Sequence, residues 1–129
     1  MSFRTTALIT ALVVLVLGVG YLLAGSLLVG RWEIEPTQSV LLFGRRIGAL
    51  YLGLSVIFFL ARSAPVSVAR TALGAGTAVA CSLLALLGVY EFSAGRAGPA
   101  ILASAAVEAL LALAYIRILV AERRVATVG

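Results

Sequence analysis

The sequence contains no histidine, no lysine and no aspartate, and its single cysteine is Cys81. One cysteine excludes an internal disulfide and a CxxC redox motif. Without histidine or a cysteine cluster, the chain also lacks the usual ligands of zinc, haem and copper sites. We therefore expect no cofactor and no metal site. We interpret Cys81, midway along an apolar run, as a small buried hydrophobic residue.

Charged residues are scarce, at 12% of the chain, and the ten basic ones are all arginine. With five glutamates as the only acids, the net charge is +5. A basic charge is typical of nucleic-acid-binding proteins. These arginines form no cluster, however, and stand at the ends of apolar segments, where they reach lipid headgroups. We expect membrane lipids as partners and no nucleic acid.

Hydrophobic residues make up 63% of the 129 residues, and they form long runs separated by short charged breaks. Soluble domains are about half apolar, so this pattern indicates an integral membrane protein. We predict an all-α fold, a single transmembrane domain over residues 1–129 that forms an up-down-up-down four-helix bundle. The predicted helices cover about residues 7–29, 38–61, 65–90 and 99–120.

Two of these boundaries have competing interpretations. The first apolar run follows Arg4 and resembles a signal peptide in that respect, but it is longer than the usual apolar region of one. The second helix begins either near Gln38 or after the pair Arg45 and Arg46. Small residues such as Gly48 are expected to let the helices approach one another closely.

The distribution of arginines predicts the orientation in the membrane. Six arginines belong to the N-terminus, the second loop and the C-terminal end, and four belong to the first and third loops. We therefore predict that both termini are cytoplasmic. Because arginine as the only base, with abundant Ala, Gly and Leu, is typical of a GC-rich bacterial genome, the expected location is the bacterial inner (plasma) membrane.

Glu108 lies near the middle of the fourth predicted helix. A charge at that depth costs about 2.5–3.5 kcal/mol on insertion scales. Protonation, a hydrogen-bond partner or an arginine can offset this cost. Helical spacing places Ser104, Ala105, Ala112 and Tyr115 on the face of Glu108. This small, mildly polar face is expected inside the bundle, with leucines on the outer side.

Arg45 is the predicted partner of Glu108. If the second helix begins at Gln38, Arg45 lies about 10 Å and Glu108 about 14 Å below the outer boundary of the bilayer, by the helix rise. We predict a buried Arg45–Glu108 ion pair, with Arg46 as the second choice. Such a pair either fixes the register of the helices or contributes to ligand binding, and the first role is the commoner one.

A ligand-binding site in the same half of the bundle is the functional hypothesis. Its members are the charged pair and four polar residues expected at similar depth, namely Tyr21, Tyr51, Ser82 and Ser104. They would line a pocket for an apolar molecule with one polar end, such as a lipid, a quinone or an isoprenoid. The competing interpretation is that each tyrosine only hydrogen-bonds a neighbouring backbone group.

The segment LLFGRRIGALYLGLSVIFFLARSAP resembles the second helix of small four-helix bacterial membrane proteins of the DoxX-like type. Arg45, Gly48, Ala49 and Gly53 carry that resemblance. GRAGPAILASAAVEALLALAYIRI resembles their last helix, where a glutamate recurs at the place of Glu108. The resemblance implies a four-helix bundle of the inner membrane and an accessory role beside membrane oxidoreductases. It implies no catalytic residue.

The sequence therefore favours a non-enzymatic membrane protein, either an accessory subunit of a larger complex or a lipophile-binding bundle. The alternative is a small homodimeric proton-coupled transporter that uses Glu108. Short four-helix multidrug exporters also use a membrane glutamate, but theirs lies in the first helix, which has no acid here. An enzyme is the least favoured class, because no nucleophile, metal ligand or second carboxylate accompanies Glu108 in the sequence.

Overall fold

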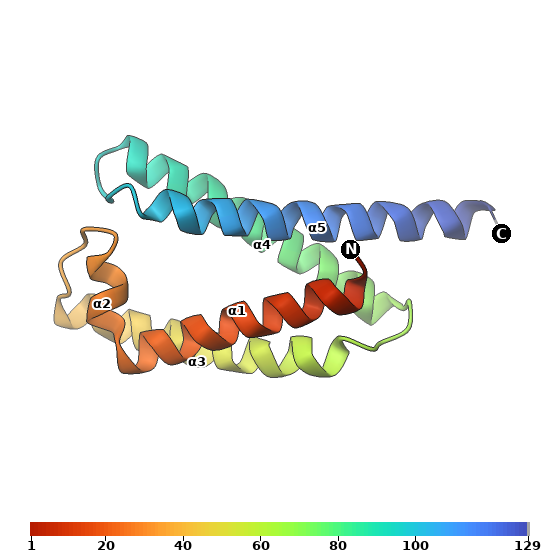
Figure 1. Cartoon of the computed structure of the whole chain (residues 1–129), viewed down its shortest axis with the longest axis horizontal. Coiled ribbons are helices and arrows are strands. Elements are labelled where there is room, and N and C mark those ends of the chain that lie inside the picture. The colour runs from red at the N-terminus through yellow and green to blue at the C-terminus, as the bar shows by residue number, and fades with distance from the viewer. Residues whose placement is uncertain (129) are drawn as a thin grey trace.

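The computed structural model describes the backbone of residues 1–128 and the side chains of residues 1–125. In this part of the chain all regular secondary structure is helical. The helices are α1 (Phe3–Leu23), α2 (Gly25–Gly30), α3 (Gln38–Ala61), α4 (Val68–Ser93) and α5 (Ile101–Val128) (Figure 1). All except the short α2 are long and apolar enough to cross a membrane, which makes four candidate spans. The predicted all-α class is confirmed.

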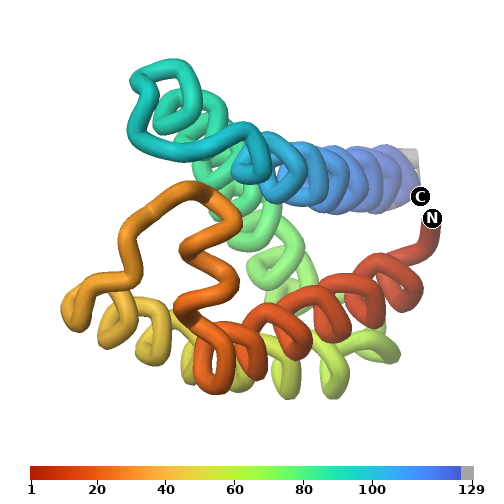
Figure 2. The backbone as a smooth tube through the Cα atoms, turned by 60° about the vertical axis from the view of Figure 1, so that its left-hand side comes forward, coloured from red at the N-terminus to blue at the C-terminus, as the bar shows by residue number. Residues whose placement is uncertain are grey.

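The four long helices form two pairs. α1 packs along α3, α4 packs along α5, and the strongest contact between the pairs is that of α1 with α5. Figures 1 and 2 show the α4–α5 pair crossing above the α1–α3 pair, with α2 and its loop at the end where the pairs diverge. Both chain ends lie at the opposite end of the molecule (Figure 1).

Polar N-cap residues explain where three of the long helices begin. The side chains of Ser2, Thr37 and Ser67 each accept a hydrogen bond from a backbone N–H in the first turn of the following helix. This is the usual way to satisfy the free N–H groups at a helix start. The helix of the second span accordingly begins at Gln38, the earlier of the two predicted starts, and α4 begins at Val68 rather than at residue 65.

The first apolar run forms two helices, so the prediction of one continuous helix over residues 7–29 is wrong. Ala24 has φ −138° and ψ 37°, outside the helical region, and Gly25 begins α2. The short helix folds back so that Leu28 fits against Gly20. A Cβ at Gly20 would lie 2.9 Å from the Leu28 Cδ1 atom. Since the chain stays apolar across the break, hydropathy does not reveal it.

A close backbone approach holds α1 against α3. A Cβ on Gly48 would lie only 2.8 Å from the carbonyl oxygen of Gly18, so no larger residue fits at Gly48 without a shift of the backbone. Further along the same interface, the Ser55 hydroxyl donates a hydrogen bond of 3.0 Å to the carbonyl oxygen of Ala11. The expectation that small residues let these helices approach is met at this crossing.

The core lies where the two pairs meet. Tyr115 of α5 is completely buried, with Phe3 and Phe58 packed against its ring at centroid distances of 6.3 and 6.1 Å. Its hydroxyl lies 2.9 Å from the Thr10 hydroxyl of α1. The predicted inner face of α5 is confirmed, because Ala105 and Ala112 are buried too. The leucines on its other side, Leu110 and Leu113, are 67% and 58% exposed.

Candidate ligand-binding cavity

A partly open cavity of about 690 Å³ lies between the two helix pairs. Residues of α1, α3, α4 and α5 line it, and nearly all of them are aliphatic or aromatic. Its size falls within the range of about 300–1,000 Å³ that is usual for small-molecule sites. The lining residues with a polar atom or sulfur in their side chains are Tyr51, Thr77, Cys81, Ser104 and Glu108.

Glu108 is the only charged residue that lines this cavity. It is partly exposed, and Ser104, one turn earlier on α5, lines the cavity with it. Tyr51, Thr77 and Cys81 line the same cavity. The structure therefore gathers a single acid, a phenol, a thiol and a hydroxyl at one place in an otherwise apolar space.

Three of the predicted site residues line the cavity together, namely Glu108, Tyr51 and Ser104. Tyr21 does not line it, but its buried ring packs against that of Tyr51, with the centroids 6.2 Å apart. Tyr21 is thus placed to hold the Tyr51 ring in position.

On α4 the cavity is lined by the neighbour of the predicted site residue. Ser82 is absent from the lining of the cavity, which Cys81 reaches instead. Cys81 is partly exposed, and its interpretation as a buried residue is corrected accordingly.

The structure does not bring Arg45 and Glu108 together. The ion pairs seen among the described side chains, Arg70–Glu122 and Arg96–Glu91, do not involve either residue. Arg45 is exposed on α3, because the buried face of that helix carries Gly44, Gly48, Ser55 and Phe58. α3 packs mainly on α1, whereas Glu108 belongs to α5 in the other helix pair.

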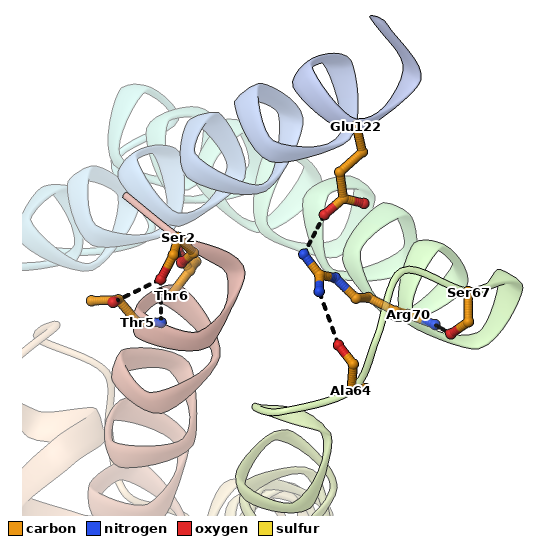
Figure 3. Close-up of polar contacts among 7 residues, drawn as sticks. All are labelled: Ser2, Thr5, Thr6, Ala64, Ser67, Arg70 and Glu122. Atoms are coloured by element: carbon orange, nitrogen blue, oxygen red, sulfur yellow. Dashed lines mark hydrogen bonds and ion pairs between the residues drawn. The ribbon is translucent and has the colours of Figure 1, made fainter. Parts of the chain in front are cut away.

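Contacts of Arg70 near the chain ends link α4 to α5, to the loop after α3 and to α1. The Arg70 guanidinium of α4 donates to the Glu122 carboxylate of α5, and it donates a second hydrogen bond, of 2.9 Å, to the Ala64 carbonyl (Figure 3). It also lies over the Phe3 ring of α1, at 4.2 Å from the centroid. Sequence reasoning missed this cluster because both residues read as ordinary membrane-surface charges.

A second contact joins the pairs at the other end, where α2 lies. The Gly98 N–H donates to the Trp32 carbonyl oxygen at 2.7 Å. The adjacent Glu33 has a φ of 60°, and a Cβ on Gly98 would lie 2.6 Å from the Glu33 Cδ atom. Beside this contact, the Glu91 carboxylate accepts hydrogen bonds from Arg96 and raises the pKa of that guanidinium. A backbone hydrogen bond therefore joins the two pairs at the end where α2 lies.

Among the described residues there is no group of three or more His, Cys, Asp or Glu side chains that could hold a metal ion. The chemistry that the cavity offers is that of one carboxylate, hydroxyl groups and a thiol, all bordered by hydrocarbon. Such an arrangement binds and orients a ligand through one polar point and a large apolar area.

Comparison with protein-family models, with curated proteins and with solved structures finds no match to this chain. The resemblance to DoxX-like proteins therefore stays a prediction, and the functional argument depends on the cavity.

Proposed function

We propose that this chain is a non-enzymatic, multi-pass membrane protein that binds an amphiphilic small molecule between its two helix pairs. The observation that carries the proposal is an apolar cavity of about 690 Å³ with Glu108 as its only charged residue. A ligand with a large apolar body fills the cavity, and its single polar group contacts Glu108. This favours lipophile binding over the accessory-subunit role that the DoxX-like resemblance implies.

The carboxylate of Glu108 has no charged neighbour in the lining of the cavity. A charged group inside a membrane costs about 2.5–3.5 kcal/mol or more and is usually found facing a functional cavity with a partner. No arginine forms an ion pair with Glu108 among the described side chains. A bound ligand supplies the missing polar contact, and its apolar part contributes roughly 25 cal/mol per Å² of surface removed from water.

The membrane placement is part of the same proposal. Four candidate spans and chain ends at the same end of the molecule fit an up-down-up-down arrangement with both termini on one side. The excess of arginine near those ends assigns that side to the cytoplasm of a bacterial cell, by the positive-inside rule. The cavity then lies within the inner membrane, where lipophilic molecules are concentrated.

The test is binding of a neutral lipophilic fluorophore, N-phenyl-1-naphthylamine, to the purified protein in lipid nanodiscs. Gly76 lines the cavity and Gly53 does not, yet neither has an atom within 4 Å of an added Cβ. We therefore expect Gly76→Leu to place a side chain in the cavity, and Gly53→Leu is its matched control. We expect saturable binding that Gly76→Leu weakens and Gly53→Leu preserves. Equal binding by both variants would contradict the proposal.

A second candidate function, proton-coupled transport by a homodimer, is favoured by one observation. The Arg45–Glu108 ion pair would hold the carboxylate charged, and that pair is absent among the described side chains. Without it, Glu108 is free to exchange a proton for a ligand. In proteoliposomes, a transporter would release an imposed pH gradient when ligand is added, and Glu108→Gln would abolish the release. A binding protein would leave the gradient intact.

A further inference from the structure

We propose that the polar group of the ligand is a cation, so that the cavity selects lipophilic monocations such as tertiary amines, quaternary ammonium ions or phosphonium ions. This inference depends on the proposed binding function and adds the chemical class of the ligand. It follows from three features of the cavity lining, namely the acid Glu108, the lack of positively charged hydrogen-bond donors and the aromatic ring of Tyr51.

The first argument is the balance of charge. When ionised, Glu108 brings one negative charge to the cavity, and no lining residue carries a positive one. Arg45 is exposed on α3, whereas Arg70 and Arg96 are paired with Glu122 and Glu91. In a space of low dielectric constant, an unbalanced negative charge attracts cations and repels anions strongly.

The second argument is the lack of positively charged donors for an anion. Carboxylate and phosphate groups are usually bound by arginine, lysine or free backbone N–H groups, and the cavity is lined by none of these side chains. The hydroxyl of Thr77 already donates to the carbonyl oxygen of Leu73 at 2.7 Å. A zwitterionic lipid headgroup is disfavoured for the same reason, since its phosphate would enter with its amine.

The third argument is the aromatic ring beside the acid. Tyr51 and Glu108 both line the cavity. A tyrosine ring near a carboxylate stabilises a cation between them, because the ring face carries partial negative charge. The packing of Tyr21 against Tyr51 restrains that ring before a ligand binds. An uncharged ligand would leave this electrostatic arrangement unused.

The experiment compares two ions of the same shape and opposite charge, tetraphenylphosphonium and tetraphenylborate. Their binding is measured by equilibrium dialysis against protein in phosphatidylcholine nanodiscs, with empty nanodiscs subtracted to remove partition into lipid. We expect the cation to bind about tenfold more tightly or better, as one favourable charge interaction implies. Equal or tighter specific binding of tetraphenylborate would overturn the inference.

Variants of Glu108 give a second test of the inference. Glu108→Gln should weaken phosphonium binding by about tenfold or more, and Glu108→Asp should retain most of it. Glu35→Gln, at an exposed position outside the cavity, is the control and should change nothing. Phosphonium binding that survives Glu108→Gln would also overturn the inference. If that variant does not fold, the preference of the wild-type protein between the two ions still decides.

The neutral fluorophore separates this inference from the function on which it depends. If the fluorophore binds and Gly76→Leu displaces it, but the two ions bind alike, the binding function stands and the preference for cations is wrong. If neither the fluorophore nor the ions bind above the level of empty nanodiscs, both proposals fail together.

Discussion

Thr10 and Tyr115, 105 positions apart in the chain, share a hydrogen bond of 2.9 Å between α1 and α5. The Thr10 hydroxyl also donates to the Thr6 carbonyl oxygen, so the phenol of Tyr115 is the donor in the contact between helices. Tyr115 is fully buried and lies one turn from Leu111, which lines the cavity. This bond therefore joins the helix pairs at the edge of the space between them.

Removing that hydroxyl should lower the stability of the whole bundle. For Tyr115→Phe we expect a loss of about 0.5–1.5 kcal/mol in the free energy of unfolding, the usual contribution of one hydrogen bond. Unfolding in mixed detergent micelles, followed by circular dichroism, compares the variant with the wild-type protein. Equal stability of the two would show that the bond contributes nothing.

The close approach of α1 and α3 predicts opposite effects for two glycines of the same helix. Gly48→Ala places a methyl group 2.8 Å from the Gly18 carbonyl oxygen, and we expect a loss of about 1–3 kcal/mol from overpacking. Gly53→Ala meets no atom within 4 Å and should stabilise α3 by about 0.5–1 kcal/mol through helix propensity. The same unfolding measurement tests both, and a tolerated alanine at Gly48 would contradict this packing.

The Arg70–Glu122 ion pair should contribute more to stability than the Arg96–Glu91 ion pair. The side chains of Arg70 and Glu122 are each 17% exposed, whereas Arg96 is 53% exposed. From alanine double-mutant cycles we expect a coupling energy of about 1 kcal/mol or more for the first pair. We expect a smaller coupling energy for the exposed second pair. A larger coupling for the exposed pair would rule out this account of the contact near the chain ends.

Arg45 and Glu108 should act independently of each other. Because the described side chains show no ion pair between them, the effects of Arg45→Ala and Glu108→Ala on unfolding should add within about 0.5 kcal/mol in the double mutant. Retention of the neutral fluorophore should be unaffected by Arg45→Ala. A double mutant that loses clearly less stability than the sum of the single losses would restore the predicted pair.

The membrane class and most helix positions were predictable because they depend on local properties. Apolar runs mark the four long helices, and helical spacing correctly placed Ala105, Ala112 and Tyr115 on the inner face of α5. The break at Ala24 was not predictable from hydropathy, because the chain stays apolar across it and the accompanying contact of Leu28 with Gly20 is tertiary. Such a contact becomes visible only when the backbone is known.

The candidate site was predicted in part, for a geometric reason. Depth in the membrane follows from counting residues, and it brought Tyr51, Ser104 and Glu108 to one level. Which helices pair, and which way each helix is rotated, depend on tertiary packing. For this reason Arg45 was assigned to a partner in the other helix pair, and Ser82 was chosen where Cys81 reaches the cavity.

The most direct test of ligand binding at Glu108 is native mass spectrometry of the protein extracted from its own membranes in a mild detergent. We predict a small-molecule adduct on the wild-type chain that is lost in Glu108→Gln and kept in the Glu35→Gln control. An adduct of the same mass and abundance in both variants, or a bare wild-type chain, would contradict the account.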